Sequence, residues 1–108
     1  MSLAKPWYVY IIESSDSRLY TGITTDIGRR WKEHLGAEPN KVYKGAKFFR
    51  GRKPTNLMYL NQFDNRSLAS KQESAIKKLS RTEKFQLIKS SDNFLDEFSD
   101  NLVLGYFD

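Results

Sequence analysis

Two runs of mostly hydrophobic residues, separated by polar ones, predict a pair of strands at the start of the chain. Residues 7–13 (WYVYIIE) and 18–24 (RLYTGIT) are rich in β-branched and aromatic side chains. The polar residues Ser-Ser-Asp-Ser lie in the interval between them. This pattern is typical of a β-hairpin.

The next periodic segment has helical spacing. Thr25 and Asp26 are candidate N-caps for a helix that ends at Leu35, before a glycine. Ile27, Trp31 and Leu35 recur every four residues, so we expect this stripe to face the sheet. No period holds from residue 37 to 54, which predicts a long loop.

The second half of the chain contains one predicted strand and two predicted helices. Residues 55–63 (TNLMYLNQF) have strand character. Asn65 or Ser67 can then cap a helix that runs to about Ser80, with an apolar side formed by Leu68, Ala75, Ile76 and Leu79. Ser80 and Glu83 have the spacing of a capping box, so a further short helix is expected to reach Ile88. The predicted order is β-β-α-β-α-α.

Composition limits the kinds of site that the chain can form. A chain of 108 residues is one domain's length. It has no cysteine and one histidine, which excludes disulfides, thiolate metal sites and sites with two histidine ligands. Any metal would therefore be bound by oxygen atoms. No apolar run reaches the roughly 20 residues of a membrane span, and residues 1–6 do not resemble a secretory signal, so a cytoplasmic location is expected.

The charges are unevenly distributed along the chain. Residues 1–89 hold all 18 Lys and Arg against 8 acidic residues, whereas residues 90–108 hold five acidic residues and no base. A strongly basic body attracts polyanions, and nucleic acid is the commonest soluble one. Six bases and three aromatic residues occur between residues 41 and 53, which indicates a nucleic-acid-binding wall; the bases are Lys41, Lys44, Lys47, Arg50, Arg52 and Lys53. A solvated surface loop is the alternative.

An ordered set of polar residues resembles the GIY-YIG nuclease superfamily. The set runs from Tyr8-Val9-Tyr10 and Tyr20-Thr21-Gly22 to Arg30, His34 and Glu73. In the first motif, Tyr8 stands where the family has glycine. The stretch 44–54 (KGAKFFRGRKP), followed by a strand and a Lys-rich helix, is similar to the small stand-alone bacterial (YhbQ-like) members of that superfamily. The resemblance covers residues 7–88 and implies an α+β fold with a small, mainly antiparallel three-stranded sheet flanked by helices. Residues 1–89 would form this domain, and 90–108 an extra acidic tail.

The resemblance also implies a role for each residue of the set. Glu73 would bind one Mg²⁺ or Mn²⁺, completed by water and substrate phosphate, and Arg30 would hold the scissile phosphate. Tyr10 would accept the proton of the attacking water with help from His34, and Tyr20 would bind metal-bound water or the phosphate. A phenol has a pKa near 10, so a tyrosine base requires cationic neighbours or the metal to lower that pKa.

Shared chemistry between the two tyrosines sets a condition on the hairpin. A three-residue loop at 15–17 would pair Tyr10 with Gly22 and keep Tyr10 and Tyr20 on one sheet face, whereas an even loop would separate them. We predict the three-residue loop. The missing side chain of Gly22 would then leave room for a phosphate over the sheet.

The expected function is metal-dependent cleavage of nucleic acid, with DNA favoured over RNA, by a monomer or weak dimer. The sequence leaves two alternatives open, a binding module without chemistry and a subunit that requires a protein partner. Individually, each residue has an ordinary explanation, such as a surface pair between Glu73 and Lys77. The acidic tail could be a helix closing the core, a contact with a partner, or a competitor of nucleic acid.

Overall fold

The structure is a computed structural model that describes residues 5–35 and 51–95. Its elements follow the predicted order: β1 (Trp7–Ser14), β2 (Leu19–Thr24), α1 (Ile27–Leu35), β3 (Pro54–Phe63), α2 (Arg66–Lys77) and α3 (Arg81–Ile88). The α+β fold class is confirmed.

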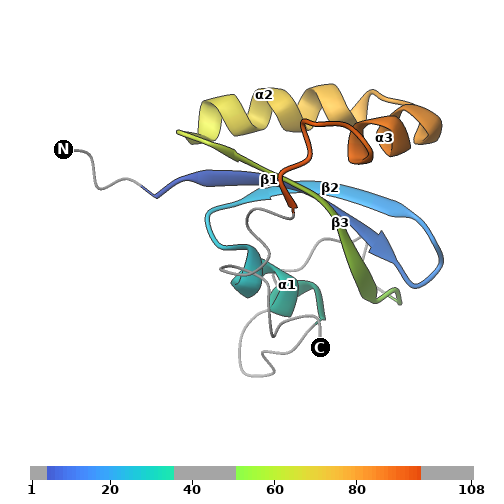
Figure 1. Ribbon diagram of the computed structural model, residues 1–108. Coiled ribbons are helices and arrows are strands. Elements are labelled where there is room, and N and C mark those ends of the chain that lie inside the picture. Colours follow the sequence, from blue (N-terminus) through green and yellow to red (C-terminus); the bar gives the residue numbers. More distant parts are fainter. Residues whose placement is uncertain (1–4, 36–50, 96–108) are drawn as a thin grey trace.

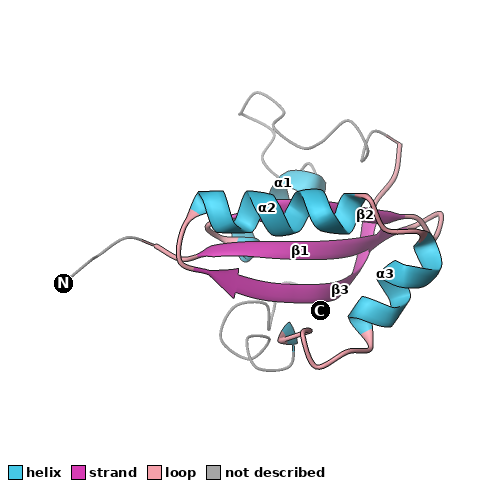
Figure 2. Cartoon of the chain, turned by 90° about the horizontal axis from the view of Figure 1, so that it is seen from above, coloured by secondary structure: helices cyan, strands magenta, loops and turns pink. Residues whose placement is uncertain are grey.

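The three strands form one antiparallel sheet with β1 in the centre and the strand order β2-β1-β3. Helix α1 covers one face of this sheet, and α2 and α3 lie on the other (Figures 1 and 2). The fold therefore has three layers, and β2 is an edge strand. None of the helices in the described part of the chain has the length and apolar character needed to cross a membrane.

The hairpin between β1 and β2 has the predicted register. The Ser14 N–H donates to the Arg18 carbonyl at 2.8 Å, which closes a three-residue loop, and Tyr10 lies opposite Gly22. Ser17 closes this loop in the left-handed region, at φ 63°, a conformation common in three-residue hairpin loops. Because the loop is odd, Tyr10 and Tyr20 lie on the same face.

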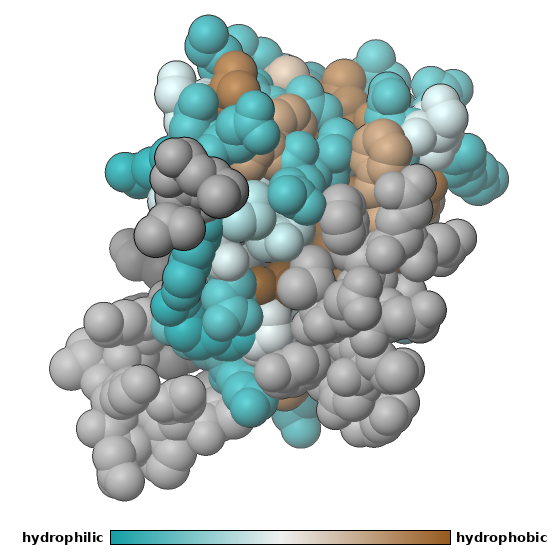
Figure 3. All heavy atoms as spheres, turned by 60° about the vertical axis from the view of Figure 1, so that its left-hand side comes forward, coloured by the Kyte–Doolittle hydropathy of each residue, from teal (hydrophilic) through white to brown (hydrophobic). Residues whose placement is uncertain are grey.

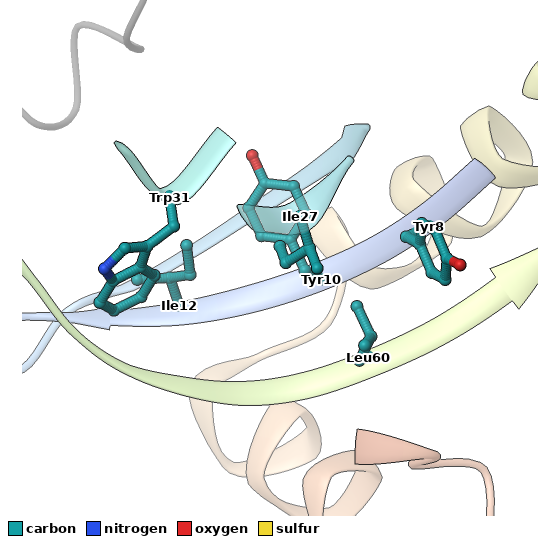
Figure 4. Packing of buried hydrophobic residues seen from close by; sticks show 6 residues of the cluster. All are labelled: Tyr8, Tyr10, Ile12, Ile27, Trp31 and Leu60. Atoms are coloured by element: carbon teal, nitrogen blue, oxygen red, sulfur yellow. The ribbon is translucent and has the colours of Figure 1, made fainter. Parts of the chain in front are cut away.

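Strict alternation along β1 divides the core into two clusters. Tyr8, Tyr10 and Ile12 point towards α1 and pack with Ile27, Trp31 and Leu60 (Figure 4). Val9 and Ile11 point to the opposite face and pack with Tyr59, Ala69 and Ile76. Burial on both sides explains why this strand is hydrophobic at nearly every position.

The helix starts follow the predicted caps. Asp26 accepts a hydrogen bond from the Arg29 N–H, and Asn65, rather than Ser67, accepts from the Leu68 N–H, both at 3.0 Å. The Ser80 and Glu83 capping box is present in both directions. Helix α2 ends at Lys77, a turn earlier than expected, because Ser80 already serves as the cap of α3.

The predicted apolar stripes were partly wrong. Leu35 was expected to face the sheet, but it is 46% exposed. On the expected apolar side of the next helix, Leu68 is 42% exposed and Ala75 is also exposed. Leu35 is the last residue of α1, while the buried side of α2 centres on Ala69 and Ile76, one residue round the helix from Leu68. On the face shown in Figure 3, hydrophilic residues predominate among those described, with small hydrophobic areas between them.

The start of the acidic tail lies along the outer edge of β3. The Asn93 side chain accepts from the Leu60 N–H at 3.3 Å and donates to the Met58 carbonyl at 2.9 Å. The Phe94 N–H donates to the Leu60 carbonyl at 2.9 Å, and Leu95 packs against the cluster on the α1 side. Residues 96–108 lie outside the described residues, so the expected helical tail stays a prediction.

Candidate active site

A chain of three polar side chains connects α1 to the centre of the sheet. The Arg30 Nε–H donates to the Tyr10 hydroxyl oxygen at 3.4 Å, and that hydroxyl lies 2.9 Å from Nε2 of His34. Arg30 and His34 lie one turn apart on α1, so they point to the same side. The register of the hairpin and the period of the helix together bring these residues into contact.

Tyr20 completes the cluster from the edge strand. Its ring centroid lies 6.1 Å from that of Tyr10 and 5.2 Å from that of His34, with an edge-to-face arrangement towards the imidazole. A hydrogen bond also links Tyr20 to the Arg30 guanidinium. The structure therefore brings together four of the five predicted catalytic residues on the α1 side of the sheet.

Burial decides the protonation states in this cluster. It raises the pKa of Tyr10, and the neighbouring Tyr20 raises it further, while Arg30 opposes these effects. Burial and the charge of Arg30 lower the pKa of His34 to about 3. Burial works against the charge of Arg30, yet its hydrogen bonds, first among them that to Tyr10, leave its pKa raised.

These shifts fix the charge states of Tyr10 and His34. At neutral pH the phenol keeps its proton and the imidazole is neutral, so the 2.9 Å hydrogen bond joins two uncharged groups. Arg30 lowers the pKa of Tyr10, as expected of a cationic neighbour, but burial outweighs this effect and the net shift is upward. His34 carries no positive charge, because burial and Arg30 lower its pKa.

Gly22 is required by the Tyr10 ring. A Cβ at this position would lie 2.5 Å from Oη and 2.7 Å from Cζ of Tyr10, and 3.0 Å from Cε2 of Tyr20. The space above Gly22 is therefore filled by the phenol, and the expectation that it leaves room for a phosphate was wrong. The glycine allows the Tyr10 ring to cross β2 on its way to His34.

Glu73 lies on α2, which covers the opposite face of the sheet from the other four residues (Figure 1). Its carboxylate raises the pKa of Tyr10 electrostatically, as the weakest of the influences on that pKa. Glu73 also lies 3.4 Å from Lys77 one turn later, and its side chain is 22% exposed. Both the catalytic position and the ordinary helix pair are therefore compatible with its placement.

One residue near the site was missed by the sequence analysis. The Glu33 carboxylate lies 3.1 Å from Nη1 of Arg30, and both side chains are largely shielded from solvent. This contact orients the guanidinium while its Nε–H reaches Tyr10. The three-residue spacing of Arg30 and Glu33 on a helix could have indicated the pair.

The predicted nucleic-acid wall is described only at its end. Arg52 donates from Nε to Asp16 at 2.8 Å. Hydrogen bonds from Ser14 and Arg52 lower the pKa of this exposed carboxyl to about 2. Lys53 is exposed, and its backbone pairs with Ser15 of the hairpin loop. The remaining predicted contacts lie outside the described residues; they are Lys41, Lys44, Lys47 and Arg50.

The candidate metal ligand is a single carboxylate. No group of three metal-binding side chains of the His, Cys, Asp and Glu types occurs in residues 5–35 and 51–95. A hard cation such as Mg²⁺ often takes one or two carboxylates and completes its shell with water and substrate phosphate. Glu73, partly exposed and electrostatically coupled to Tyr10, fits that kind of site.

Known proteins share both the sequence and the fold of this chain. It is 49% identical over 86 residues to a UPF0213 protein of Desulfotalea psychrophila, which covers 80% of this chain and 74% of the relative. It is 42% identical over 89 residues to a UPF0213 protein of Citrobacter koseri, covering 82% and 83%. The solution NMR structure of a UPF0213 protein from Bacillus halodurans matches with a TM-score of 0.51 and 35% identity, covering 91% of this chain and 99% of that one.

The model of the GIY-YIG catalytic domain matches residues 6–86. The chain belongs to the GIY-YIG family. The matched residues include β1, β2, α1 and α2 in full, and with them all five predicted catalytic residues. Membership of GIY-YIG indicates a nuclease family, whereas the roles of the individual residues remain predictions.

Proposed function

We propose that this GIY-YIG protein is a metal-dependent endonuclease that hydrolyses phosphodiester bonds, in DNA rather than RNA. The observation that carries the proposal is the hydrogen-bonded chain from Arg30 through Tyr10 to His34. It combines a fixed cation with a proton donor and a proton acceptor. Hydrolysis of a phosphodiester needs an activated water and stabilised phosphoryl oxygens, and this chain supplies groups for both.

Arg30 binds the scissile phosphate in this mechanism. Its pKa is raised, so it stays charged throughout the reaction. Tyr10 and Glu33 orient the guanidinium, and its side chain is 20% exposed, at the rim of the cluster. An oriented guanidinium stabilises the charge that develops on two phosphoryl oxygens at once.

Tyr10 and His34 accept the proton of the attacking water as a pair. Because burial raises the pKa of Tyr10, a free tyrosinate is disfavoured at neutral pH. The water proton passes to the Tyr10 oxygen while the phenolic proton passes to Nε2 of His34, which becomes an imidazolium. The negative charge of the bound phosphate stabilises that cation, and Tyr20 packs beside both rings.

Glu73 would hold a divalent ion, Mg²⁺ or Mn²⁺. When bound there, such an ion neutralises phosphoryl charge and assists the leaving oxygen. Lys77 would then be displaced from the carboxylate that it contacts at 3.4 Å. The Lys77 side chain is 55% exposed, so its contact with Glu73 contributes little to stability and can be replaced.

The substrate is tested with a labelled panel of duplex, single-stranded, flapped and branched DNA, together with RNA. Cleavage is measured with Mg²⁺, Mn²⁺ or chelator for the wild type, Arg30→Ala and Glu73→Gln. We expect metal-dependent cleavage of DNA by the wild type and loss in both variants. Branched or damaged DNA, as in repair or recombination, is the expected class because the described residues form one three-layer unit with no separate sequence-reading domain among them.

The same panel distinguishes the alternatives. Salt-dependent binding without cleavage in any combination would replace the proposal with a binding module. Cleavage that appears only after addition of a cell extract would instead indicate a subunit that needs a partner. Cleavage unaffected by either substitution would show that the reaction does not use this site.

A further inference from the structure

A second basic site lies outside the cluster around Tyr10. A pocket of about 300 Å³ opens between the start of β2 and the first turn of α3. It is lined by Arg18, Leu19, Arg81 and Lys84. Three of these four side chains are cations, they come from two separate elements, and the lining contains no acidic side chain.

Arg81 and Arg18 have contacts that leave their positive charges available to a ligand. Arg81 stacks on Phe85, with its guanidinium carbon 5.0 Å from the ring centroid. Arg18 approaches Asp16 at 3.4 Å, but that carboxylate makes its shorter contact, at 2.8 Å, with Arg52. The Arg18 side chain remains 65% exposed. An exposed ion pair of this length contributes little, so Arg18 can turn towards another anion.

The acidic residue nearest in sequence to Arg81 and Lys84 is part of the helix cap of α3. Glu83 lies between Arg81 and Lys84 on α3, and its carboxylate accepts from the Ser80 N–H at 2.9 Å as part of the capping box. The cap therefore holds this negative charge at the helix start. The pocket keeps a net positive lining.

The pocket adjoins the candidate active site through β2. Leu19 and Tyr20 are consecutive, so their side chains point to opposite faces of the sheet. Tyr20 packs into the cluster with Tyr10 and His34, whereas Leu19 packs on the side of α2 and α3. Because β2 is an edge strand, a nucleic-acid strand leaving the active site can cross this edge and reach the pocket.

We propose that this pocket binds a backbone phosphate of the nucleic acid, on one side of the bond that is cleaved. The inference rests on the proposed nuclease function and adds a second point of contact to it. Two guanidinium groups and one ammonium group match the several oxygens of a phosphate better than a single carboxylate, and planar guanidinium groups bind such oxygens in pairs. The charge of the lining favours a phosphate group rather than a base.

The test compares two variants that remove the same charge. Arg81→Ala/Lys84→Ala removes two cations from the pocket, while Lys71→Ala/Lys78→Ala (the α2 variant) removes two exposed cations from α2 and its C-cap, which line a separate pocket. Affinity for the cleaved oligonucleotide is measured by fluorescence anisotropy between about 50 and 200 mM salt, together with the cleavage rate at saturation. We expect the pocket variant to bind about tenfold more weakly and to lose about one to two units of the salt slope. Its saturated rate should stay close to the wild-type rate.

A set of modified substrates locates the contact. Each phosphate near the cleaved bond is replaced in turn by an uncharged methylphosphonate. One flanking position should weaken binding to the wild type and to the α2 variant but not to Arg81→Ala/Lys84→Ala. If both variants lose affinity equally, or if no methylphosphonate position distinguishes them, the pocket is not a phosphate site. The proposed nuclease function would be unaffected by that result. If the wild type neither binds nor cleaves any oligonucleotide, the proposed function fails and this inference fails with it.

Discussion

The Tyr10 hydroxyl is hydrogen-bonded to Nε2 of His34 at 2.9 Å, although the two residues are 24 positions apart in the chain. Tyr10 comes from the central strand and His34 from the last turn of α1. Burial keeps the phenol protonated and the imidazole neutral. This hydrogen bond is the path along which the proposed mechanism passes a proton from Tyr10 to His34.

Removal of the Tyr10 hydroxyl should abolish most of the cleavage. We expect Tyr10→Phe to lower the single-turnover rate by about 10²- to 10⁴-fold, the usual range for loss of an acid-base group. The fold should survive with a loss of about 1–3 kcal/mol, because a buried imidazole nitrogen loses its hydrogen-bond partner. Tyr59→Phe is the matched control, since Tyr59 is equally buried on the other face. Equal rates for the two variants would contradict the proton relay.

A methyl group at position 22 should displace Tyr10. The added Cβ of Gly22→Ala would meet Oη and Cζ of Tyr10 at 2.5 and 2.7 Å. We expect a loss of about 1–3 kcal/mol in thermal or urea unfolding, the range for overpacking in a core. The same substitution made in Tyr10→Ala should cost much less, because the crowded atoms are gone. An equal cost in both backgrounds would mean that another contact requires the glycine.

The unusual pKa of His34 should appear in the pH dependence of stability. Its folded pKa of about 3 lies below the ordinary value near 6.5. The unfolded chain therefore takes up a proton below pH 6.5 while the folded protein does not. The contribution of His34 to the free energy of unfolding should be fully present above pH 6.5. It should fall as the pH decreases towards 3, by up to about 1.4 kcal/mol per pH unit.

This titration can be assigned because His34 is the only histidine in the chain. Urea unfolding between pH 5 and 7 should show the slope in the wild type and a nearly flat line in His34→Asn. Carboxyl groups titrate mainly below this window. A slope that persists in His34→Asn would assign the effect to another group.

Substitution of Glu73 distinguishes a metal ligand from a helix ion pair. Glu73→Gln keeps the shape of the side chain but removes the charge that would bind Mg²⁺. We expect it to lower cleavage by at least about a hundredfold, in line with loss of a catalytic electrostatic group. Lys77→Ala breaks the same 3.4 Å pair from the other side and should leave cleavage nearly unchanged. Similar effects of both substitutions would indicate that the ion pair itself is what matters.

The strand, turn and helix-cap patterns of the sequence predicted the fold because they indicated the same order of elements. The odd hairpin loop required Tyr10 to face Gly22, and the structure has that register. The capping box of Ser80 and Glu83 marked the start of α3 to the residue. Leu35 and Leu68 were assigned to the wrong side because helical spacing gives a stripe, whereas burial depends on where the sheet ends.

The sequence indicated which residues of the candidate site lie close together, but it did not indicate their pKa values. Residue spacing placed Arg30 and His34 on one helix face. Burial of the Tyr10 hydroxyl, which decides its pKa, arises from tertiary packing that no local pattern records. The pairing of Asp16 with Arg52 joins positions 36 residues apart, and the contact between β2 and α3 around Arg18 likewise depends on the assembled fold.

The short segment around Asn93 also affects how the protein interacts with other protein chains. Exposed strand edges recruit strands from other chains and so promote aggregation. Asn93 and Phe94 satisfy the outward-facing backbone groups of Met58 and Leu60, so the β3 margin offers an approaching chain no ready template there. These two residues, at the start of the acidic tail, occupy hydrogen-bonding positions that a strand of another chain would otherwise use, and so oppose the addition of a strand at that edge.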